Sequence, residues 1–305
     1  MNIVESTGLG KRYGKTWALR ECTLAIPGGH VAALVGPNGA GKTTLLNMTV
    51  GLATQTAGII TVLGGMPAGS PGALDGIAFV AQDTPLYKNL SAADMLHLTR
   101  NLNRRFDAGY ARARLDEVGI PLERRAGTMS GGQQAQLALT LALARHPQLL
   151  VLDEPMAMLD PLARHDFMAT VMTAMADDGV SVLMSSHVLA ELERVADYLV
   201  LMSNGRVQLA GEVDDLLARH HVLTGPTDEV GDFTHALDVV QARRGVAVTH
   251  LLVRTDGVTD AVQAGWESHP VSLEELTLAY MRDPGVREVP GPARPAIVQP
   301  MELRN

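Results

Sequence analysis

The sequence contains a single cysteine, Cys22, among its 305 residues. One thiol cannot form an internal disulfide or a metal site built from several cysteines, and so low a cysteine content is typical of the reducing cytosol. The sequence also lacks any apolar run of the about 18 residues that a membrane-spanning helix needs, and its start lacks the apolar core of a signal peptide. We therefore expect a soluble cytoplasmic protein that reaches a membrane only through a partner.

An excess of positive charge is missing as well, because the formal net charge is -8. Nucleic acids are bound through clustered lysine and arginine side chains, so we expect no nucleic acid as a partner. A hydrophobic content of 46% supports a well-packed core. The length suits one large α/β domain together with a smaller one.

Residues 36–43 (Gly-Pro-Asn-Gly-Ala-Gly-Lys-Thr) fit the phosphate-binding pattern Gly-x4-Gly-Lys-Ser/Thr. The apolar residues 31–35 before them predict a buried strand, and residues 44–48 after them predict the start of a helix. In such a turn, backbone N–H groups form an anion-binding nest at a helix N-terminus, and glycines permit the necessary backbone angles. Lys42 can reach the β- and γ-phosphates, and the Thr43 hydroxyl can coordinate Mg²⁺. This stretch predicts a nucleoside triphosphate site.

Two adjacent carboxylates follow the apolar residues 149–152, which predict a central parallel strand. In a protein with a phosphate loop, Asp153 can hold the Mg²⁺ shell and Glu154 can polarise the attacking water as a general base. Two acids directly after a four-residue apolar strand favour this functional interpretation over chance.

Polar side chains also follow two other predicted strands. Gln82 comes after residues 77–80, and His187 comes after residues 180–184. Open α/β sheets bind ligands at the carboxyl ends of their strands, so both side chains are candidates for ligand contact, His187 with the γ-phosphate. The alternatives are an ordinary polar residue at a strand exit and a structural histidine.

Residues 130–133 (Ser-Gly-Gly-Gln) precede the nearly apolar residues 137–144, which predict a buried helix. The N-terminus of that helix could bind an anion, and the alternative is that Ser130 caps the helix with nothing bound. Asp160 followed by Pro161 predicts another helix start, with Asp160 as the N-cap.

Residues 91–127 predict an all-helical insertion that begins with Ser91 as an N-cap. Its arginines are interpreted as a solvated helix surface, with a partner-facing or lipid-facing role as the alternative; they are Arg100, Arg104, Arg105, Arg112 and Arg114.

Upstream of the phosphate loop, Tyr13 could stack on adenine or could be a half-buried strand tyrosine.

The ordered set of motifs resembles the ATP-binding subunit of an ABC transporter over about residues 3–215. The correspondences are residues 36–43 with the Walker A loop, Gln82 with the Q-loop, residues 129–133 with the signature motif, residues 149–154 with Walker B, residues 159–161 with the D-loop, and His187 with the switch histidine. Six motifs in the right order are far more specific than any one of them. This lowers the weight of the structural alternatives for Gln82, Ser130 and His187.

The resemblance implies an α/β fold: a P-loop NTPase core with an antiparallel β subdomain and an inserted α-helical subdomain at about residues 83–127. It implies an enzyme, a Mg²⁺-dependent ATPase, with ATP and Mg²⁺ as cofactors. The implied catalytic residues are Lys42, Gln82, Glu154 and His187, and the implied metal ligands are Thr43, Gln82 and Asp153. The implied nucleotide contacts are Tyr13, Gly36, Asn38, Gly39, Ala40, Gly41, Lys42, Thr43, Thr44, Ser130, Gly131, Gly132, Gln133 and Asp160.

The resemblance also implies two protein partners. One is a second ATPase subunit, a homodimer being expected, arranged head-to-tail so that ATP lies between one Walker A loop and the other signature motif. The other is a membrane permease that docks on the helical subdomain and holds the chain peripherally on the inner face of the cell membrane.

Residues 160–164 and 185–193 are similar in style to ATPases of the ABC-2 type, which include bacterial drug and antibiotic exporters. We therefore expect the motor subunit of an exporter, the alternatives being an importer ATPase and a soluble ABC-type ATPase without a membrane partner. One departure from the family pattern is Gln136, which stands where the signature helix often carries arginine. We expect an ion pair to be missing there.

The pattern changes after the ATPase domain, which we place at residues 1–219. Residues 220–285 predict a small α+β accessory domain, with a strand at 246–253 and a helix capped by Ser272 with Glu275 at its third position. The proline-containing residues 286–305 are predicted to be a disordered tail.

Overall fold

The structure is a computed structural model, and it describes residues 1–83, 86–186, 192–227, 237–255 and 266–282. Its centre is a six-stranded sheet with the strand order β10-β9-β3-β8-β7-β6. The strands are β3 (Val31–Val35), β6 (Ile77–Val80), β7 (Leu149–Asp153), β8 (Ser181–Ser185), β9 (Tyr198–Ser203) and β10 (Arg206–Glu212). β9, β3, β8, β7 and β6 pair in parallel, and β10 pairs antiparallel to β9.

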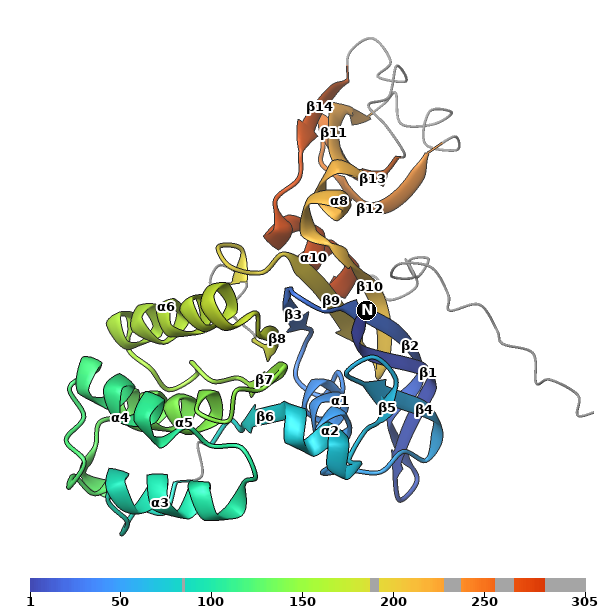
Figure 1. The fold of residues 1–305 in the computed structure, drawn as a ribbon. Helices are drawn as coiled ribbons and strands as arrows, with labels where there is room; N and C mark the ends of the chain where they lie inside the picture. Colours follow the sequence, from blue (N-terminus) through green and yellow to red (C-terminus); the bar gives the residue numbers. More distant parts are fainter. Residues whose placement is uncertain (84–85, 187–191, 228–236, 256–265, 283–305) are drawn as a thin grey trace, which may run out of the picture.

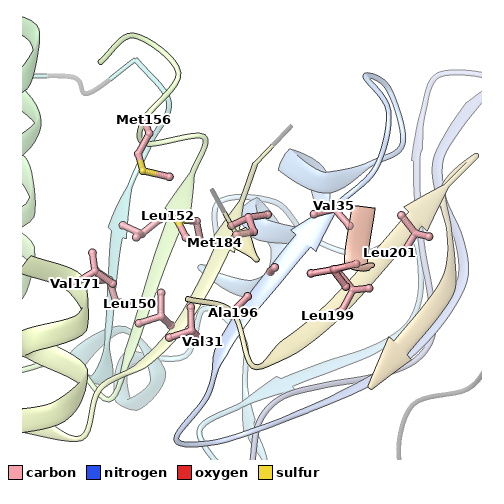
Figure 2. Close-up of a cluster of buried hydrophobic side chains, with 14 of the residues drawn as sticks. Val31, Val35, Leu150, Leu152, Met156, Val171, Met184, Ala196, Leu199 and Leu201 are labelled. Atoms are coloured by element: carbon pink, nitrogen blue, oxygen red, sulfur yellow. The ribbon is translucent and has the colours of Figure 1, made fainter. Parts of the chain in front are cut away.

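Both faces of the central sheet are buried, which is why its strands are apolar without alternation. On one face, Val31 and Leu150 join a core cluster with side chains of α5 (Gly131–Leu143) and α6 (Pro161–Asp178) (Figure 2). On the other face, Leu34 and Val151 join a second cluster with side chains of α1 (Lys42–Thr49). Because neighbouring residues of one strand enter opposite clusters, the strand positions are fixed from both sides.

A second, antiparallel sheet covers the α1 side and has the order β2-β1-β4-β5. Its strands are β1 (Asn2–Tyr13), β2 (Thr16–Pro27), β4 (Ala57–Val62) and β5 (Met66–Pro67), and α2 (Pro71–Gly76) follows them. Apolar side chains from β1, β2 and β4 enter the same cluster as those of α1. The antiparallel β subdomain that the family resemblance implied is confirmed by this sheet.

The predicted helical insertion is confirmed as α3 (Ala92–Leu102), α4 (Ala108–Glu117) and the short 3-10 helix η1 (Ala126–Thr128), which lie together in green in Figure 1. Ser91 caps α3 in a capping box with Asp94. These helices pack on one another and on Leu137 of α5 through a cluster of their own.

The C-terminal part forms a third sheet with the order β12-β13-β11-β14, all antiparallel. The elements are α8 (Val213–Ala218), β11 (His220–Pro226), β12 (Asp238–Arg244), β13 (Val248–Arg254), β14 (Glu267–Pro270) and α10 (Leu273–Arg282). Ser272 and Glu275 form the predicted cap at the start of α10. The predicted tail, residues 286–305, lies outside the described residues.

The C-terminal sheet and helix share a core with the ATPase part. The central cluster runs from Leu199 and Leu209 in β9 and β10 through Leu216 in α8 to Leu276 and Tyr280 in α10. All five side chains are buried. A boundary at residue 219 therefore cuts through continuous packing, between the end of α8 and the start of β11.

We expect Leu276→Ala to destabilise the whole chain by about 2–5 kcal/mol, because a fully buried leucine loses both transfer free energy and packing. Leu276 is 0% exposed, whereas Leu102 in α3 is 74% exposed. Leu102→Ala is thus the matched control and should change the free energy of unfolding by no more than ~0.5 kcal/mol. Urea unfolding measures both, and native-state hydrogen exchange should show weakened protection of the β9 and β10 amides in Leu276→Ala. Unchanged protection there would contradict a shared core.

Candidate functional site

The phosphate-loop residues form a tight turn between β3 and α1. Gly41 precedes the first helical residue with φ 100, and α1 has no side-chain cap. A Cβ added at Gly41 would lie 2.6 Å from the carbonyl oxygen of Ala18, and one at Gly36 would lie 2.3 Å from that of Met202. Both positions therefore require glycine sterically. The uncapped start of α1 leaves backbone N–H groups directed at the loop, which is the arrangement that binds phosphate.

Lys42 is held against this loop. Its side chain is 6% exposed, and its Nζ donates hydrogen bonds to the carbonyl oxygens of Gly36 at 2.7 Å and Pro37 at 3.3 Å. Burial lowers the pKa of Lys42, and the charges of Glu154 and Asp153 act in the opposite direction. A buried ammonium group beside the loop supplies part of the positive charge that a triphosphate requires.

The two carboxylates at the end of β7 are organised by a serine from the neighbouring strand. Ser185 at the end of β8 donates a hydrogen bond to Asp153 Oδ1 at 2.6 Å and accepts one from the Glu154 backbone N–H at 2.9 Å. Asp153 is 3% exposed. Glu154 has φ 45, a left-handed conformation that is uncommon for a residue with a side chain and that turns the chain sharply at the site.

One cavity of about 520 Å³ brings most of the predicted residues together. Its lining is Tyr13, Ala18, Asn38, Gly39, Ala40, Gly41, Lys42, Thr43, Thr44, Gln82 and Glu154. This volume is typical of small-molecule sites. Tyr13 is 54% exposed, so its ring lies at the mouth of the cavity and not in the core. The Nζ atom of Lys11 lies 5.1 Å from the centroid of this ring.

The predicted signature and D-loop residues do not line this cavity. Ser130 caps α5 through a capping box with Gln133, and Asp160 caps α6 by accepting a hydrogen bond from the Ala163 N–H at 2.9 Å. Gly131 and Gly132 are the first two residues of α5. His187 lies outside the described residues.

Two residues of the site were missed by the sequence analysis. Ala18 lines the cavity from β2, and no motif marks it. Ser185 lies at a predicted strand end, but its partners are reached only through strand pairing, with Asp153 opposite Ser185 in the β7–β8 register. The polar residue at the end of a buried strand was the available signal.

Comparison with known proteins agrees with this geometry. Residues 19–157 match the family model described as ABC transporter. A lantibiotic transport ATP-binding protein, SrtF of Streptococcus pyogenes, is 33% identical over 214 residues, which cover 70% of this chain and 92% of the relative. The chain belongs to the ABC transporter family of ATP-binding subunits.

Other members of the ABC transporter family agree in sequence and in fold. A thiamine import ATP-binding protein, ThiQ of Escherichia coli, is 31% identical over 201 residues, covering 64% of this chain and 87% of the relative. A solved structure of an ATP-binding subunit of an ABC transporter superposes with a TM-score of 0.63 at 28% identity, over 70% of this chain and 91% of that one. The fold is therefore that of an ABC ATPase cassette, and the protein is an ATP-binding subunit that hydrolyses ATP. No helix within the described residues is both long and apolar enough to cross a membrane.

We expect Ser185→Ala to reduce ATP hydrolysis by roughly 10- to 100-fold, because partners that orient a reacting shell have effects of this size. Loss of the hydroxyl removes one hydrogen bond from Asp153 Oδ1 and one from the Glu154 N–H. Ser181→Ala is the matched control: it removes a buried hydroxyl at the other end of the same strand, where it accepts a hydrogen bond from Gly29. Steady-state hydrolysis and thermal unfolding measure both variants. Equal losses of activity in the two would contradict a role for Ser185 in the site.

Proposed function

We propose that this chain is the ATP-hydrolysing motor subunit of a bacterial exporter, coupled to a separate membrane-spanning permease. The observation that carries this proposal is the cavity in which the phosphate loop, Gln82, Glu154 and Tyr13 meet. Similarity to a lantibiotic transport ATP-binding protein supports export. Similarity to a thiamine import ATP-binding protein supports a second candidate, an importer ATPase.

In the proposed mechanism, the backbone N–H groups and Lys42 bind the β- and γ-phosphates, and the Tyr13 ring stacks on adenine. Asn38, Gly39, Ala40, Gly41 and Thr44 line the phosphate-binding part of the cavity beside them. Glu154 accepts the proton of the attacking water as a general base. We assign the γ-phosphate contact of the switch histidine to His187.

The residues at the cavity fit a bound Mg²⁺ ion. Thr43 offers a hydroxyl and Gln82 an amide oxygen in the cavity lining, and Asp153 offers a carboxylate from the position next to the lining residue Glu154. Oxygen donors of these kinds together with phosphate oxygens are what Mg²⁺ prefers. Ser185 engages Asp153 Oδ1, which leaves the other carboxylate oxygen available as a ligand. When bound, the ion would neutralise phosphate charge. Thr43, Gln82 and Asp153 would hold it.

A second copy of the chain completes the proposed site. Ser130, Gly131, Gly132 and Gln133 do not line the cavity of their own chain, so their helix start can serve a nucleotide only on another copy. Two solvent-exposed apolar side chains lie on either side of Asp160 in the sequence: Met158 is 87% exposed and Leu162 is 70% exposed. Exposed apolar groups of this kind favour burial against a partner. We infer a head-to-tail homodimer in which two segments of one copy cover ATP bound to the other. These segments are Asp160 and the start of α5, residues 130–133, which we call the signature turn.

The permease is assigned to the helical subdomain, about residues 83–127, within an ATPase domain at residues 1–219. Tyr87 is 65% exposed and Leu102 is 74% exposed there, which supports a docking surface. Binding to the permease would hold the chain on the inner face of the cell membrane. Residues 220–285 are proposed as an accessory domain that packs against the ATPase core.

We expect the purified chain to hydrolyse ATP in a Mg²⁺-dependent manner, and Glu154→Gln to lose that activity by at least ~100-fold while it still binds ATP. The variant keeps the size of the side chain and removes the base. Phosphate release and binding of a fluorescent ATP analogue measure the two properties. Hydrolysis no faster than in the variant, or dependence on neither Mg²⁺ nor Glu154, would overturn the proposed mechanism.

We expect tagged Glu154→Gln protein, solubilised from native membranes, to retain a multi-span membrane protein more strongly with ATP than without it. Blocked hydrolysis should hold the closed dimer on its permease. Glu154→Gln combined with Ser130→Glu is the control, because a carboxylate at the signature turn repels the γ-phosphate on the second copy. Recovery of ribosomes, DNA-associated factors or a bare dimer would contradict the transporter role. A gene for a periplasmic-type binding protein beside the permease gene would favour import.

A further inference from the structure

The signature turn and the Asp160 turn are the starts of two helices that touch each other. A Cβ added at Gly132, the second residue of α5, would lie 2.9 Å from the Cβ of Ala163 in the first turn of α6. One at Gly131 would lie 3.6 Å from the carbonyl oxygen of Met158. Glycine at the signature turn therefore lets the two helix starts approach closely. Any rotation of α5 relative to α6 changes how both turns face a second copy.

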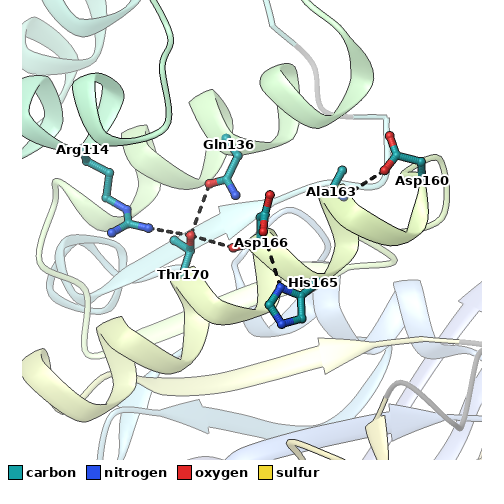
Figure 3. A network of polar contacts seen from close by, with 7 residues as sticks. All are labelled: Arg114, Gln136, Asp160, Ala163, His165, Asp166 and Thr170. Carbon is teal, nitrogen blue, oxygen red and sulfur yellow. Dashed lines mark hydrogen bonds and ion pairs between the residues drawn. The ribbon is translucent and has the colours of Figure 1, made fainter.

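Further along the same helix pair, three polar side chains meet around one hydroxyl (Figure 3). Arg114 of α4 donates a hydrogen bond from Nη2 to Thr170 Oγ1 at 2.5 Å. The Thr170 hydroxyl lies 3.4 Å from Gln136 Oε1 on α5 and 3.0 Å from the carbonyl oxygen of Asp166 on its own helix. Thr170 thus joins α4, α5 and α6 at a single point.

This cluster lies largely between packed helices, and at its edge Arg114 Nη1 lies 3.5 Å from Glu117 Oε2, whose side chain is exposed. Gln136 is 7% exposed, Thr170 is 4% exposed, and the Arg114 side chain is 14% exposed. Among the described residues, Arg114 Nε and Gln136 Nε2 find no hydrogen-bond acceptor. Burying polar groups that are only partly paired opposes folding, and replacing a whole set of this kind by apolar side chains of similar size is often neutral or stabilising. The cluster is therefore poorly explained as a stabilising device.

Hydrogen bonds can fix the relative orientation of two helices more closely than apolar contacts can. The part of α5 that faces α6 is made mostly of alanine and leucine, whose packing is non-directional and tolerates small rotations or shifts of a helix. A hydrogen bond is restricted in distance and angle, and a single buried polar contact can fix the register between helices.

We propose that Arg114, Gln136 and Thr170 are positioning residues that fix the orientation of α5 against α6. In this role they fix the position of the signature turn relative to the start of α6 at Asp160, so that both can contact ATP bound to a second copy. This inference rests on the proposed function, because it needs a nucleotide shared between two chains. Arg114, from the helical subdomain, makes the register depend on the position of α4 as well.

The test is Thr170→Val, which removes the hydroxyl and keeps the shape, with Thr173→Val as the matched control. Thr173 lies on the exposed side of the same helix, and its hydroxyl makes the same type of bond, to the Ala169 carbonyl oxygen at 2.9 Å. Thr170→Ser keeps the hydroxyl and serves as the rescue variant. All are made in the full chain for hydrolysis, and in the Glu154→Gln background for ATP-driven dimerisation.

Thr170→Val is expected to lower kcat and the ATP-driven dimer affinity by on the order of tenfold each, since small misplacements of reacting groups have effects of at least this size. Binding of ATP to the single chain should match that of Thr173→Val, and Thr170→Ser should restore kcat. The Tm of Thr170→Val should fall below that of Thr173→Val, because Arg114 loses a buried acceptor, while the chain stays folded at the assay temperature. Gln136→Leu should give the same loss, and combining it with Thr170→Val should add little. Gln136→Leu alone tests the proposal if Thr170→Val does not fold.

Two results would overturn the proposal, and they are distinguishable. If the Glu154→Gln parent does not dimerise with ATP, the shared-nucleotide function fails and this inference fails with it. If the parent dimerises normally while Thr170→Val and Gln136→Leu both behave like Thr173→Val, the inference alone fails. A fall in kcat accompanied by an equal fall in single-chain ATP affinity would also overturn it, because the loss would then lie in the cavity.

Discussion

The parallel pairing of three strands fixes the distance between the phosphate loop and the carboxylates. β8 lies between β3 and β7, with Leu34 opposite Ser185 on one side and Asp153 opposite Ser185 on the other. The three chains therefore end in one row, at the edge where the loop, the acids and the serine must meet. Strand register is set by burial on both faces of the sheet, so the core holds the site in place.

The charges at this edge are arranged for a ligand that carries several negative charges. Lys42 is buried, and burial lowers its pKa while the neighbouring Glu154 and Asp153 favour its charged form. The charge of Lys42 is already more than offset by these two carboxylates before nucleotide arrives, and a triphosphate adds negative charge that one lysine cannot neutralise alone. In the proposed dimer, a metal ion and the helix N-terminus of the second copy would supply the remaining positive charge.

Local motifs made much of this site predictable from the sequence. The phosphate loop, the acids after β7 and the caps at Ser130 and Asp160 depend on neighbouring residues, and the structure has each element where the pattern indicated. Contacts across the fold were not predictable in the same way. Ser185 reaches Asp153 through pairing of strands 32 positions apart, and no local pattern records that.

The arginine run shows the same limit. Arg104 is a solvated side chain, 82% exposed, as predicted for all five arginines. For Arg114 the prediction was wrong, because the packing of α4 against α5 and α6 directs that side chain to the buried Thr170. The absence of arginine at position 136 indicated a missing ion pair, and the structure has a hydrogen-bond cluster there whose guanidinium comes from Arg114 of α4. Sequence identifies which residue is unusual, and the three-dimensional contacts show what replaces it.

Contacts between residues far apart in the sequence also join the C-terminal part to the rest of the chain. Helix α10 contacts the ATPase core through a hydrogen bond and through apolar packing. The Glu274 N–H donates to Glu193 Oε1 at 3.0 Å, and Leu276 and Tyr280 join the central core cluster. Within the C-terminal part, His220 at the start of β11 lies 2.9 Å from the Tyr280 hydroxyl in a buried pair. Burial lowers the pKa of His220 and raises the pKa of Tyr280 to about 12, so both stay neutral near pH 7. Two neutral groups can share a hydrogen bond in an apolar core at little cost, whereas a charged pair would incur a large desolvation penalty. The accessory part is thus built as an extension of the cassette core, and its packing contributes to the strands that form one edge of the central sheet.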